Sequence, residues 1–283
     1  MGFIEAVVLG LIQGLTEFLP ISSSAHLRIA GTFLPGATDP GATFTAITQI
    51  GTELAVILYF RKDIARIIGR WFRHFGSSKG SHAVAIPKDD PDVRLGWLII
   101  IGTIPIVIVG FLAQDTIRST FRSLWIIAIV LIVFGIILGI ADYLGRKVKP
   151  IERLTYRDGI LIGLAQILAL IPGVSRSGAT MSAGLGLGYT RPAAARYGFL
   201  LAIPAVFGSG LYELVHSFGE PEGVYGYPET LVATVVAFAV GYAVIAFLMR
   251  YIEKRSFLPF VIYRIALGVT LLVLLSLGVI SPL

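Results

Sequence analysis

The sequence predicts an all-α polytopic membrane protein with an inverted-topology repeat, containing six transmembrane helices and two re-entrant helix–loop–helix hairpins. Two observations support this prediction. Hydrophobic residues make up 55% of the chain and charged residues only 14%, whereas soluble domains carry about 25% charged residues. A motif rich in proline and hydroxyl side chains also occurs in both halves, as QGLTEFLPISSSAH at 13–26 and PGVSRSGAT at 172–180. We expect one integral membrane domain over 1–283, with repeats at approximately 1–145 and 155–283.

The two motifs occupy matching places in their halves. At a common offset of about 153 positions, the matching pairs are Gly10 and Gly163, Leu11 and Leu164, Gln13 and Gln166, Leu15 and Leu168, Ser22 and Ser175, and Ser24 and Ser177. Pro20 and Pro172 miss this register by one residue. A polar loop that interrupts an apolar segment in both halves is typical of a site near the midplane of a membrane protein built from inverted repeats.

Six apolar segments approach or reach the length of about 17–25 residues that crosses the hydrocarbon core. They lie near 43–60, 95–113, 124–144, 197–213, 230–249 and 258–279. The loops 61–94, 146–157 and 250–255 are rich in Lys and Arg, which places them in the cytoplasm by the positive-inside rule. The segment 212–229 holds four glutamates and no Lys or Arg, and the 114–123 turn has two arginines. Both fit the outer side, so all these assignments agree with one alternating topology.

The two motif regions do not fit as simple spans. Residues 158–190 follow a cytoplasmic cluster and precede a segment that must run outward, so both ends of this region lie on the cytoplasmic side. Residues 2–30 are the counterpart and should re-enter from the outer side. The breaks fall at Pro20 and Pro172, since proline interrupts helices. We expect the two broken loops to meet near the midplane.

Composition also excludes several functions. The chain has no cysteine, so thiol catalysis, thiolate metal sites and disulfides are excluded. No soluble domain is apparent, because the longest polar segment, 61–94, is too short and too charged to bury a core. The net charge of +6 is therefore interpreted as anchoring at the anionic inner leaflet, with membrane lipid and not nucleic acid as the partner.

The helix breaks predict an anion site. Free backbone N–H groups and the positive end of the following half-helix point at each break. Ser22 or Ser23 is placed to cap the first half-helix, and Ser175 or Ser177 to cap the second. Arg176 adds a permanent charge and a bidentate fork that suits phosphate oxygens.

A carboxylate belongs to the same region. Gln13 and Glu17 are four residues apart and share a helix face, with Glu17 nearer the break. A carboxylate in an anion site indicates that a divalent cation bridges it to phosphate, or that it acts as a base. A structural Glu17–Arg176 ion pair is the simpler alternative, and serines or glycines in membrane helices often serve packing alone.

Three further polar residues lie at membrane depth. Gln49 and Glu53 share a face of the 43–60 span, and Arg264 lies inside the last span. We expect a structural Glu53–Arg264 pair, while Gln49 could face the site. Such residues are functional by default because they are costly in lipid.

The two motifs together resemble the undecaprenyl-pyrophosphate phosphatase (bacitracin-resistance protein) family. The resemblance covers essentially the whole chain and includes FLPFVIYR at 257–264. It implies an integral membrane enzyme that hydrolyses the C55 lipid pyrophosphate to the monophosphate and inorganic phosphate, recycles the carrier for cell-wall synthesis, confers bacitracin resistance and needs a divalent cation. The functional positions it implies are Gln13, Glu17, Ser22, Ser23, His26, Ser175, Arg176 and Thr180.

Two departures from the family pattern bear on the site. Gln13 stands where many members have Glu, which weakens a scheme in which two carboxylates bind the metal. Ala25 replaces a frequent glycine, so the backbone before His26 must avoid positive φ.

The expected roles follow from phosphoryl-transfer chemistry, which needs an in-line nucleophile and neutralised oxygens. We predict Ser23 as the nucleophile, with Glu17 or His26 taking its proton. The pyrophosphate would be bound by Arg176 and by the hydroxyls of Ser22, Ser175, Ser177 and Thr180. Mg²⁺ or Ca²⁺ would bridge it to Glu17, with Gln13 as a second candidate ligand. His26 as the nucleophile is the rival assignment.

Two wider alternatives accompany this prediction. Inverted repeats with broken helices are also the plan of secondary transporters and lipid flippases, so transport of a phosphorylated substrate is the second hypothesis. For the enzyme, we expect a bacterial plasma (inner) membrane location with the site opening to the outer side, because the hairpin with Glu17, Ser23 and His26 enters from there. The partners would be the polyprenyl pyrophosphate lipid and a second copy of the chain in a homodimer.

Overall fold

The computed structural model of this chain describes residues 2–34, 40–76, 86–87, 89–113, 123–218 and 225–282. Within these ranges the chain is helical, with one isolated β-bridge between Lys149 and Tyr189. The helices are α1 Phe3–Thr16, α2 Ser23–Phe33, α3 Gly41–Tyr59, α4 Arg61–Gly76, α5 Pro91–Leu112, α7 Leu124–Leu144, α8 Tyr156–Gln166, α9 Arg176–Gly186, α10 Arg191–Ser217, α11 Tyr227–Lys254 and α12 Leu258–Ser276, with short 3₁₀ turns at Ile151–Arg153 and Ile167–Leu170. The predicted all-α fold class is confirmed.

Six of these helices are long and apolar enough to cross a membrane: α3, α5, α7, α10, α11 and α12. Each coincides with one of the six predicted apolar segments. Apolar side chains such as Phe111, Ile129 and Ile262 point outward from these helices and are exposed, as expected for a surface that faces lipid. The chain is therefore a multi-pass membrane protein.

Both motif regions form pairs of short helices. Helices α1 and α2 have 14 and 11 residues, and α8 and α9 have 11 each. At a rise of 1.5 Å per residue, none of the four is long enough to cross the hydrocarbon core alone. The breaks lie where the motifs predict them, between Thr16 and Ser23 and between Gln166 and Arg176. Entry of the two pairs from opposite sides of the membrane stays a prediction.

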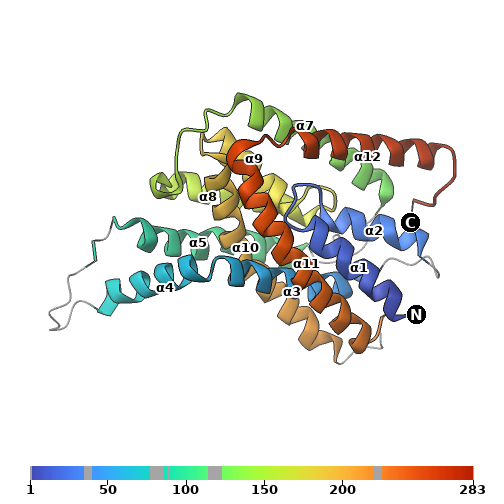
Figure 1. Cartoon of the computed structure of the whole chain (residues 1–283), viewed down its shortest axis with the longest axis horizontal. Helices are drawn as coiled ribbons and strands as arrows, with labels where there is room; N and C mark the ends of the chain where they lie inside the picture. The colour runs from blue at the N-terminus through green and yellow to red at the C-terminus, as the bar shows by residue number, and fades with distance from the viewer. Residues whose placement is uncertain are drawn as a thin grey trace.

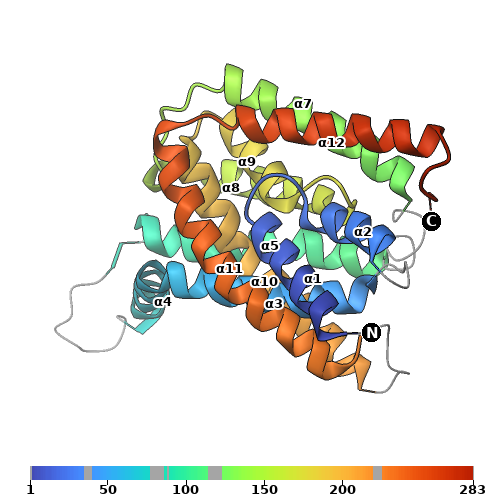
Figure 2. The same ribbon diagram turned by 45° about the vertical axis from the view of Figure 1, so that its right-hand side comes forward.

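In each half of the chain, the first short helix packs on a long helix of the other half. Helix α1 packs on α11 of the second half, whereas α8 packs on α5 of the first half. Glycines allow both contacts: a Cβ at Gly10 would lie 2.4 Å from the carbonyl oxygen of Ala233, and one at Gly163 would lie 2.7 Å from the Cα of Gly102. Helices α7 and α12 lie side by side along one edge of the molecule (Figures 1 and 2). The inverted relation of the two halves stays a prediction.

The polar 61–94 segment, interpreted above as a cytoplasmic loop, contains helix α4, which extends to the side of the bundle in Figure 1. Its apolar side, including Ile64 and Ile67, packs on α5 and the hydrophobic core, and Arg70 forms an ion pair with Asp90 at the start of α5. An amphipathic helix of this kind suits the membrane surface. Some charged residues used in the topology prediction fall outside the described residues, namely Lys79, Lys88, Arg118, Arg122, Glu220 and Glu222.

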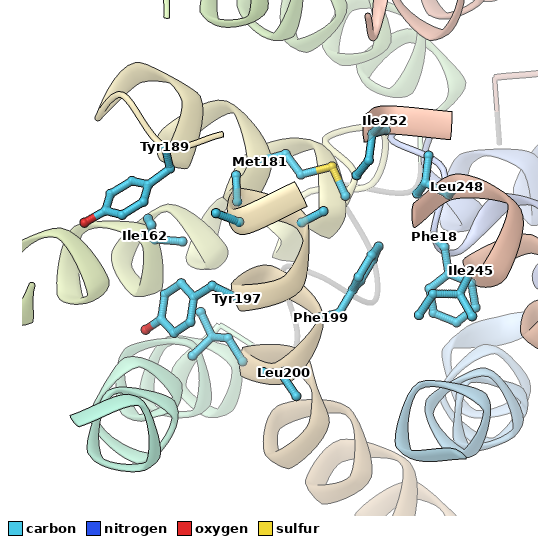
Figure 3. Packing of buried hydrophobic residues seen from close by; sticks show 14 of the residues in the cluster. Phe18, Ile162, Met181, Tyr189, Tyr197, Phe199, Leu200, Ile245, Leu248 and Ile252 are labelled. Atoms are coloured by element: carbon cyan, nitrogen blue, oxygen red, sulfur yellow. The ribbon is translucent and has the colours of Figure 1, made fainter. Parts of the chain in front are cut away.

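A core of buried hydrophobic side chains lies between the short helices and α10 and α11 (Figure 3). In it, the ring of Phe18 meets that of Phe199 edge to face, with centroids 5.5 Å apart. The Tyr197 hydroxyl lies 3.1 Å from the carbonyl oxygens of both Leu98 and Gly159. Since Phe18 follows Glu17 directly, burial of its ring positions the first broken loop against α10.

Candidate active site

The two helix breaks have the same local geometry. Ser22 precedes α2 with a φ of 75°, and its Oγ accepts a hydrogen bond from Ala25 N at 3.4 Å. Ser175 precedes α9 with a φ of 69°, and its Oγ accepts from Gly178 N at 3.2 Å. Positive φ is uncommon outside glycine and is found where surrounding structure enforces it. The predicted serine caps are confirmed at these two positions, and the residue forced to positive φ is Ser22, not Ala25.

Each capping serine also contacts the serine two residues further along the chain. The Ser22 hydroxyl lies 3.2 Å from that of Ser24, and the Ser175 hydroxyl lies 3.0 Å from that of Ser177. Ser22 Oγ accepts a further hydrogen bond, of 3.1 Å, from the backbone N–H of Gly173 in the other loop. The two breaks are therefore in direct contact, as the repeated motif predicts.

Arg264 hydrogen-bonds to both loops. This fully buried side chain of α12 donates from Nη1 to the carbonyl oxygens of Pro20 at 2.9 Å and Val174 at 3.0 Å. It donates from Nη2 to Gly173 O at 2.7 Å, and from Nε to Leu131 O at 3.3 Å. Three of these bonds go to loop carbonyl groups next to the helix breaks, and the fourth goes to helix α7.

The expected pairing of Glu53 with Arg264 is wrong. Arg264 uses its donors on backbone carbonyls, and the cationic group near Glu53 is instead Arg176, whose Nη2 lies 3.8 Å from Glu53 Oε2. The sequence shows which charged groups lie at membrane depth, but carbonyls exposed by a helix break compete for an arginine as effectively as a carboxylate does.

Glu17 accepts hydrogen bonds from four side chains in the site. Its Oε2 accepts hydrogen bonds from Ser23 Oγ at 2.6 Å, from Gln13 Nε2 at 2.7 Å and from Gln49 Nε2 at 3.5 Å. Its Oε1 accepts from Nη2 of Arg176, with which it forms an ion pair. The structure thus brings together Gln13, Glu17, Ser23 and Arg176 of the predicted set. Gln49 joins them, as the sequence allowed.

A cavity of about 500 Å³ opens at this cluster, within the range of small-molecule sites. Its polar end is formed by Glu17, Ser22, Ser23, Ser24, Ser175 and Arg176, and its walls by apolar residues of α3, α5 and α10. It also reaches Ala42, Phe111 and Tyr212, which lie near the ends of those helices that the charge pattern assigns to the outer side. The cavity therefore combines a charged end with an apolar path.

Besides Gln13, which is fully buried, three predicted residues are not among those that line this cavity. The His26 ring hydrogen-bonds through Nδ1 to Ser22 O at 2.7 Å and through Nε2 to the Tyr263 hydroxyl at 2.7 Å. Thr180 Oγ1 donates to Arg176 O at 3.0 Å, and Ser177 Oγ donates to Leu19 O at 3.2 Å. These residues support the backbone around the site. With both ring nitrogens engaged, His26 is not positioned as the base for Ser23.

Sequence reasoning missed Tyr263. Its ring stacks on that of His26 with centroids 5.6 Å apart. It lies in the FLPFVIYR segment, directly before Arg264, so that segment contributes to the site twice. The signal was present in the motif, but only the fold shows that the last span reaches α2.

The described residues contain no cluster of three or more His, Cys, Asp or Glu side chains that could hold a metal ion. Oxygen atoms of the kind that bind a divalent cation are nevertheless present. The Oε1 atom of Gln13 is buried and has no hydrogen-bond partner in the described ranges, and Glu17 lies beside it. Carboxylate and amide oxygens are the ligands that Mg²⁺ and Ca²⁺ prefer. These residues fit a cation whose remaining ligands come from a phosphate.

Comparisons with known proteins agree with this site. The family model described as bacitracin resistance protein BacA matches residues 6–270. The chain is 65% identical to a protein named undecaprenyl-diphosphatase from Micrococcus luteus, over 99% of this chain and all of the relative. It is 65% identical to one of the same name from Clavibacter michiganensis, with the same coverage. It is 58% identical to undecaprenyl-diphosphatase 2 of Agrobacterium fabrum, over 99% of this chain and 98% of that one.

Proposed function

The chain belongs to the bacitracin resistance protein BacA family, and we infer that it hydrolyses undecaprenyl diphosphate to undecaprenyl phosphate and inorganic phosphate. This reaction recycles the lipid carrier for cell-wall synthesis and is the basis of resistance to bacitracin. The observation that supports placing the reaction in the cavity is the 2.6 Å hydrogen bond from Ser23 to Glu17, opposite Arg176. The alternative, a transporter or flippase, needs anion affinity but has no use for a nucleophile paired with a base.

Substrate binding depends on the two helix N-termini. The diphosphate enters the polar end of the cavity, where the backbone N–H groups at the start of α2 and α9 point at the gap. Arg176 exchanges its contact with Glu17 for phosphate oxygens, which it can bind in bidentate fashion. The prenyl chain stays among the apolar side chains of α5 and α10 or in lipid, so only the charged head group enters the polar site.

Ser23 carries the reaction. Its Oγ attacks the terminal phosphorus in line with the bridging oxygen, and Glu17 takes the hydroxyl proton through the existing hydrogen bond. The P–O bond to the bridging oxygen breaks, and undecaprenyl phosphate leaves. Glu17 gives that first proton to the departing undecaprenyl phosphate and is ionised again. Water then attacks the phosphorus of the phosphoserine and gives a proton to Glu17, which passes it to Ser23 Oγ as the serine P–O bond breaks, so that inorganic phosphate leaves and the Ser23 hydroxyl is restored.

A divalent cation, Mg²⁺ or Ca²⁺, would supply neutralisation of the phosphate oxygens at Glu17 and Gln13. Removing it with EDTA should abolish phosphate release, and adding Mg²⁺ or Ca²⁺ should restore it. Undiminished turnover in EDTA would mean that Arg176 and the two helix N-termini suffice.

A mutant series tests the roles of Ser23 and His26. Phosphate release by the purified protein in detergent should fall at least about 1000-fold in Ser23→Ala, as when a nucleophile is removed. It should fall less in His26→Ala, because His26 orients the backbone before α2. Ser276→Ala is the matched control, since this exposed serine at the end of α12 hydrogen-bonds to Leu272 O of its own helix. Full turnover by Ser23→Ala together with an inactive His26→Ala would reverse the assignment and make His26 the nucleophile.

The same proposal places the enzyme in the bacterial plasma membrane with its cavity open to the outer side. This rests on the basic loops and on the residues lining the cavity near the opposite helix ends. In intact cells, a membrane-impermeant thiol reagent should label Ser24→Cys; labelling only from the cytoplasmic side would reverse the orientation. Homodimer formation is a separate expectation, and cross-linking in native membranes tests it.

A further inference from the structure

A second buried carboxylate, Glu53, lies beside the site and takes no part in the steps above. Its side chain in α3 is fully buried, and neither of its carboxylate oxygens has a hydrogen-bond partner in the part of the chain that the structure describes. A buried carboxylate without hydrogen bonds is costly unless a cation balances its charge. A single ionic neighbour, Arg176, is shown for it among those residues.

One nitrogen of Arg176 lies between two carboxylates. Its Nη2 donates to Glu17 Oε1 and lies 3.8 Å from Glu53 Oε2. The two carboxylates come from different elements, the end of α1 and the middle of α3, and converge on the same atom. Carboxylate oxygens that converge on one point are ligands of the kind that Ca²⁺ and Mg²⁺ use.

Binding of the diphosphate changes the charge balance at this point. When Arg176 turns to the phosphate oxygens, Glu17 and Glu53 face each other without the cation that separated them. Two carboxylates close together disfavour joint ionisation unless a positive charge compensates. A divalent cation supplies the two charges needed and binds phosphate oxygens at the same time.

Because residue 13 is a glutamine, a second carboxylate beside Glu17 has to come from another helix, α3. Position 13, one helical turn before Glu17, carries a neutral amide. Its Nε2 donates to Glu17, which leaves Oε1 buried without a partner among the described residues. At this site the end of helix α1 therefore offers a single carboxylate, that of Glu17. Glu53, on the neighbouring helix α3, offers the other.

We propose that Glu53 supplies the second carboxylate of a cation site, so that a divalent cation binds between Glu17 and Glu53 with the amide oxygen of Gln13 beside it. The proposal rests on the proposed function for one step, the transfer of Arg176 to the diphosphate. The cation and the Arg176 guanidinium are alternative occupants of the same place.

Calcium binding to the purified protein in detergent, measured by isothermal titration without any lipid substrate, tests this directly. Glu53→Gln should weaken Ca²⁺ binding roughly tenfold or more, the size of effect that changes at metal sites produce. The double variant Gln13→Glu with Glu53→Gln should regain most of the affinity, because the second carboxylate is returned to α1. Glu253→Gln, an exposed carboxylate at the end of α11, is the control and should bind Ca²⁺ as the wild type does.

A second arm tests the shared position. Arg176→Gln should tighten Ca²⁺ binding, because it removes the competing cation, and adding Glu53→Gln should cancel that gain. Size-exclusion profiles and circular dichroism establish that each variant is folded. Because Glu53→Gln removes a buried charge without hydrogen bonds, we expect it to fold.

Unchanged Ca²⁺ affinity in folded Glu53→Gln would overturn the proposal. A loss that the Gln13→Glu exchange does not restore would also overturn it, since Glu53 would then act only by positioning Arg176. Phosphate release from undecaprenyl diphosphate is measured on the same preparations. Intact Ca²⁺ binding without phosphate release would count against the hydrolase, and phosphate release without a Glu53-dependent Ca²⁺ site would count against this proposal alone.

Discussion

Replacing Arg264 by methionine should separate the two loops of the site. Methionine has a similar length and no donor, so the carbonyl oxygens of Pro20, Gly173 and Val174 all lose the hydrogen bonds of 2.7–3.0 Å that they now accept. These groups lie in the interior, where water cannot replace the lost donors. The substitution therefore removes one of the connections between the two loops and leaves the direct hydrogen bonds from Gly173 N to Ser22 Oγ and from Ser177 Oγ to Leu19 O.

The magnitude follows from the bonds lost. A hydrogen bond to a charged group contributes about 1.5–3 kcal/mol, so three of them amount to roughly 5–9 kcal/mol. The desolvation penalty of the buried guanidinium, several kcal/mol, is no longer incurred in Arg264→Met. We expect a net destabilisation of about 3 kcal/mol. Because a displacement of about 1 Å between reacting groups can lower a rate about 100-fold, turnover should fall by about that factor.

Thermal unfolding in detergent, followed by tryptophan fluorescence, measures the first effect and phosphate release measures the second. Arg264→Lys should be intermediate, since one ammonium group can reach only part of the carbonyl set. Arg255→Met at the exposed end of α11 is the control. If Arg264→Met keeps both the melting temperature and the turnover of the wild type, the other contacts between the loops suffice to position them and this reasoning is wrong.

Two further predictions concern helix packing and the cytoplasmic side. Gly163→Leu should destabilise the protein by about 1–3 kcal/mol through overpacking against Gly102, whereas Gly186→Ala, where a Cβ meets nothing within 4 Å, should be neutral in thermal unfolding. The hydrogen bond from Arg70 lowers the pKa of Asp90, so the folded value lies below the unfolded value of about 3.9. The stability that the Arg70–Asp90 pair contributes should be complete above that value and lost as the pH falls through the folded pKa. Between about pH 6 and pH 3, the melting temperature of Arg70→Gln should therefore fall less steeply than that of the wild type. Equal falls in the two proteins would show that the pair does not contribute.

The six spans could be predicted because hydrocarbon imposes length and apolarity on any helix that crosses it. Their ends could not. The span predicted at 197–213 extends over Arg191–Ser217, because Thr190 caps the helix well before its apolar part begins. Helix α4 was not predicted. Its apolar residues lie on one face only, so its sequence lacks the continuous apolar stretch of a membrane span.

The site could be predicted where its functional residues belong to one of the two motifs. The caps at Ser22 and Ser175 and the cluster of Glu17, Ser23 and Arg176 follow from residue type and spacing. The partner of Arg264 did not follow, because the carbonyls it binds carry no signature in the sequence. The same holds for Tyr263, whose contact with His26 depends on where α12 meets α2.

The place of Arg264 in α12 has a consequence for biosynthesis. The loops it joins are completed early in translation, around Pro20 and Gly173, whereas the arginine that binds both belongs to the last described helix. Until α12 has entered the membrane, those loops lack their common donor and the cavity lacks its final shape. We therefore expect the growing chain to cleave the lipid at most slowly while it is still being inserted, and full activity to follow the arrival of α12.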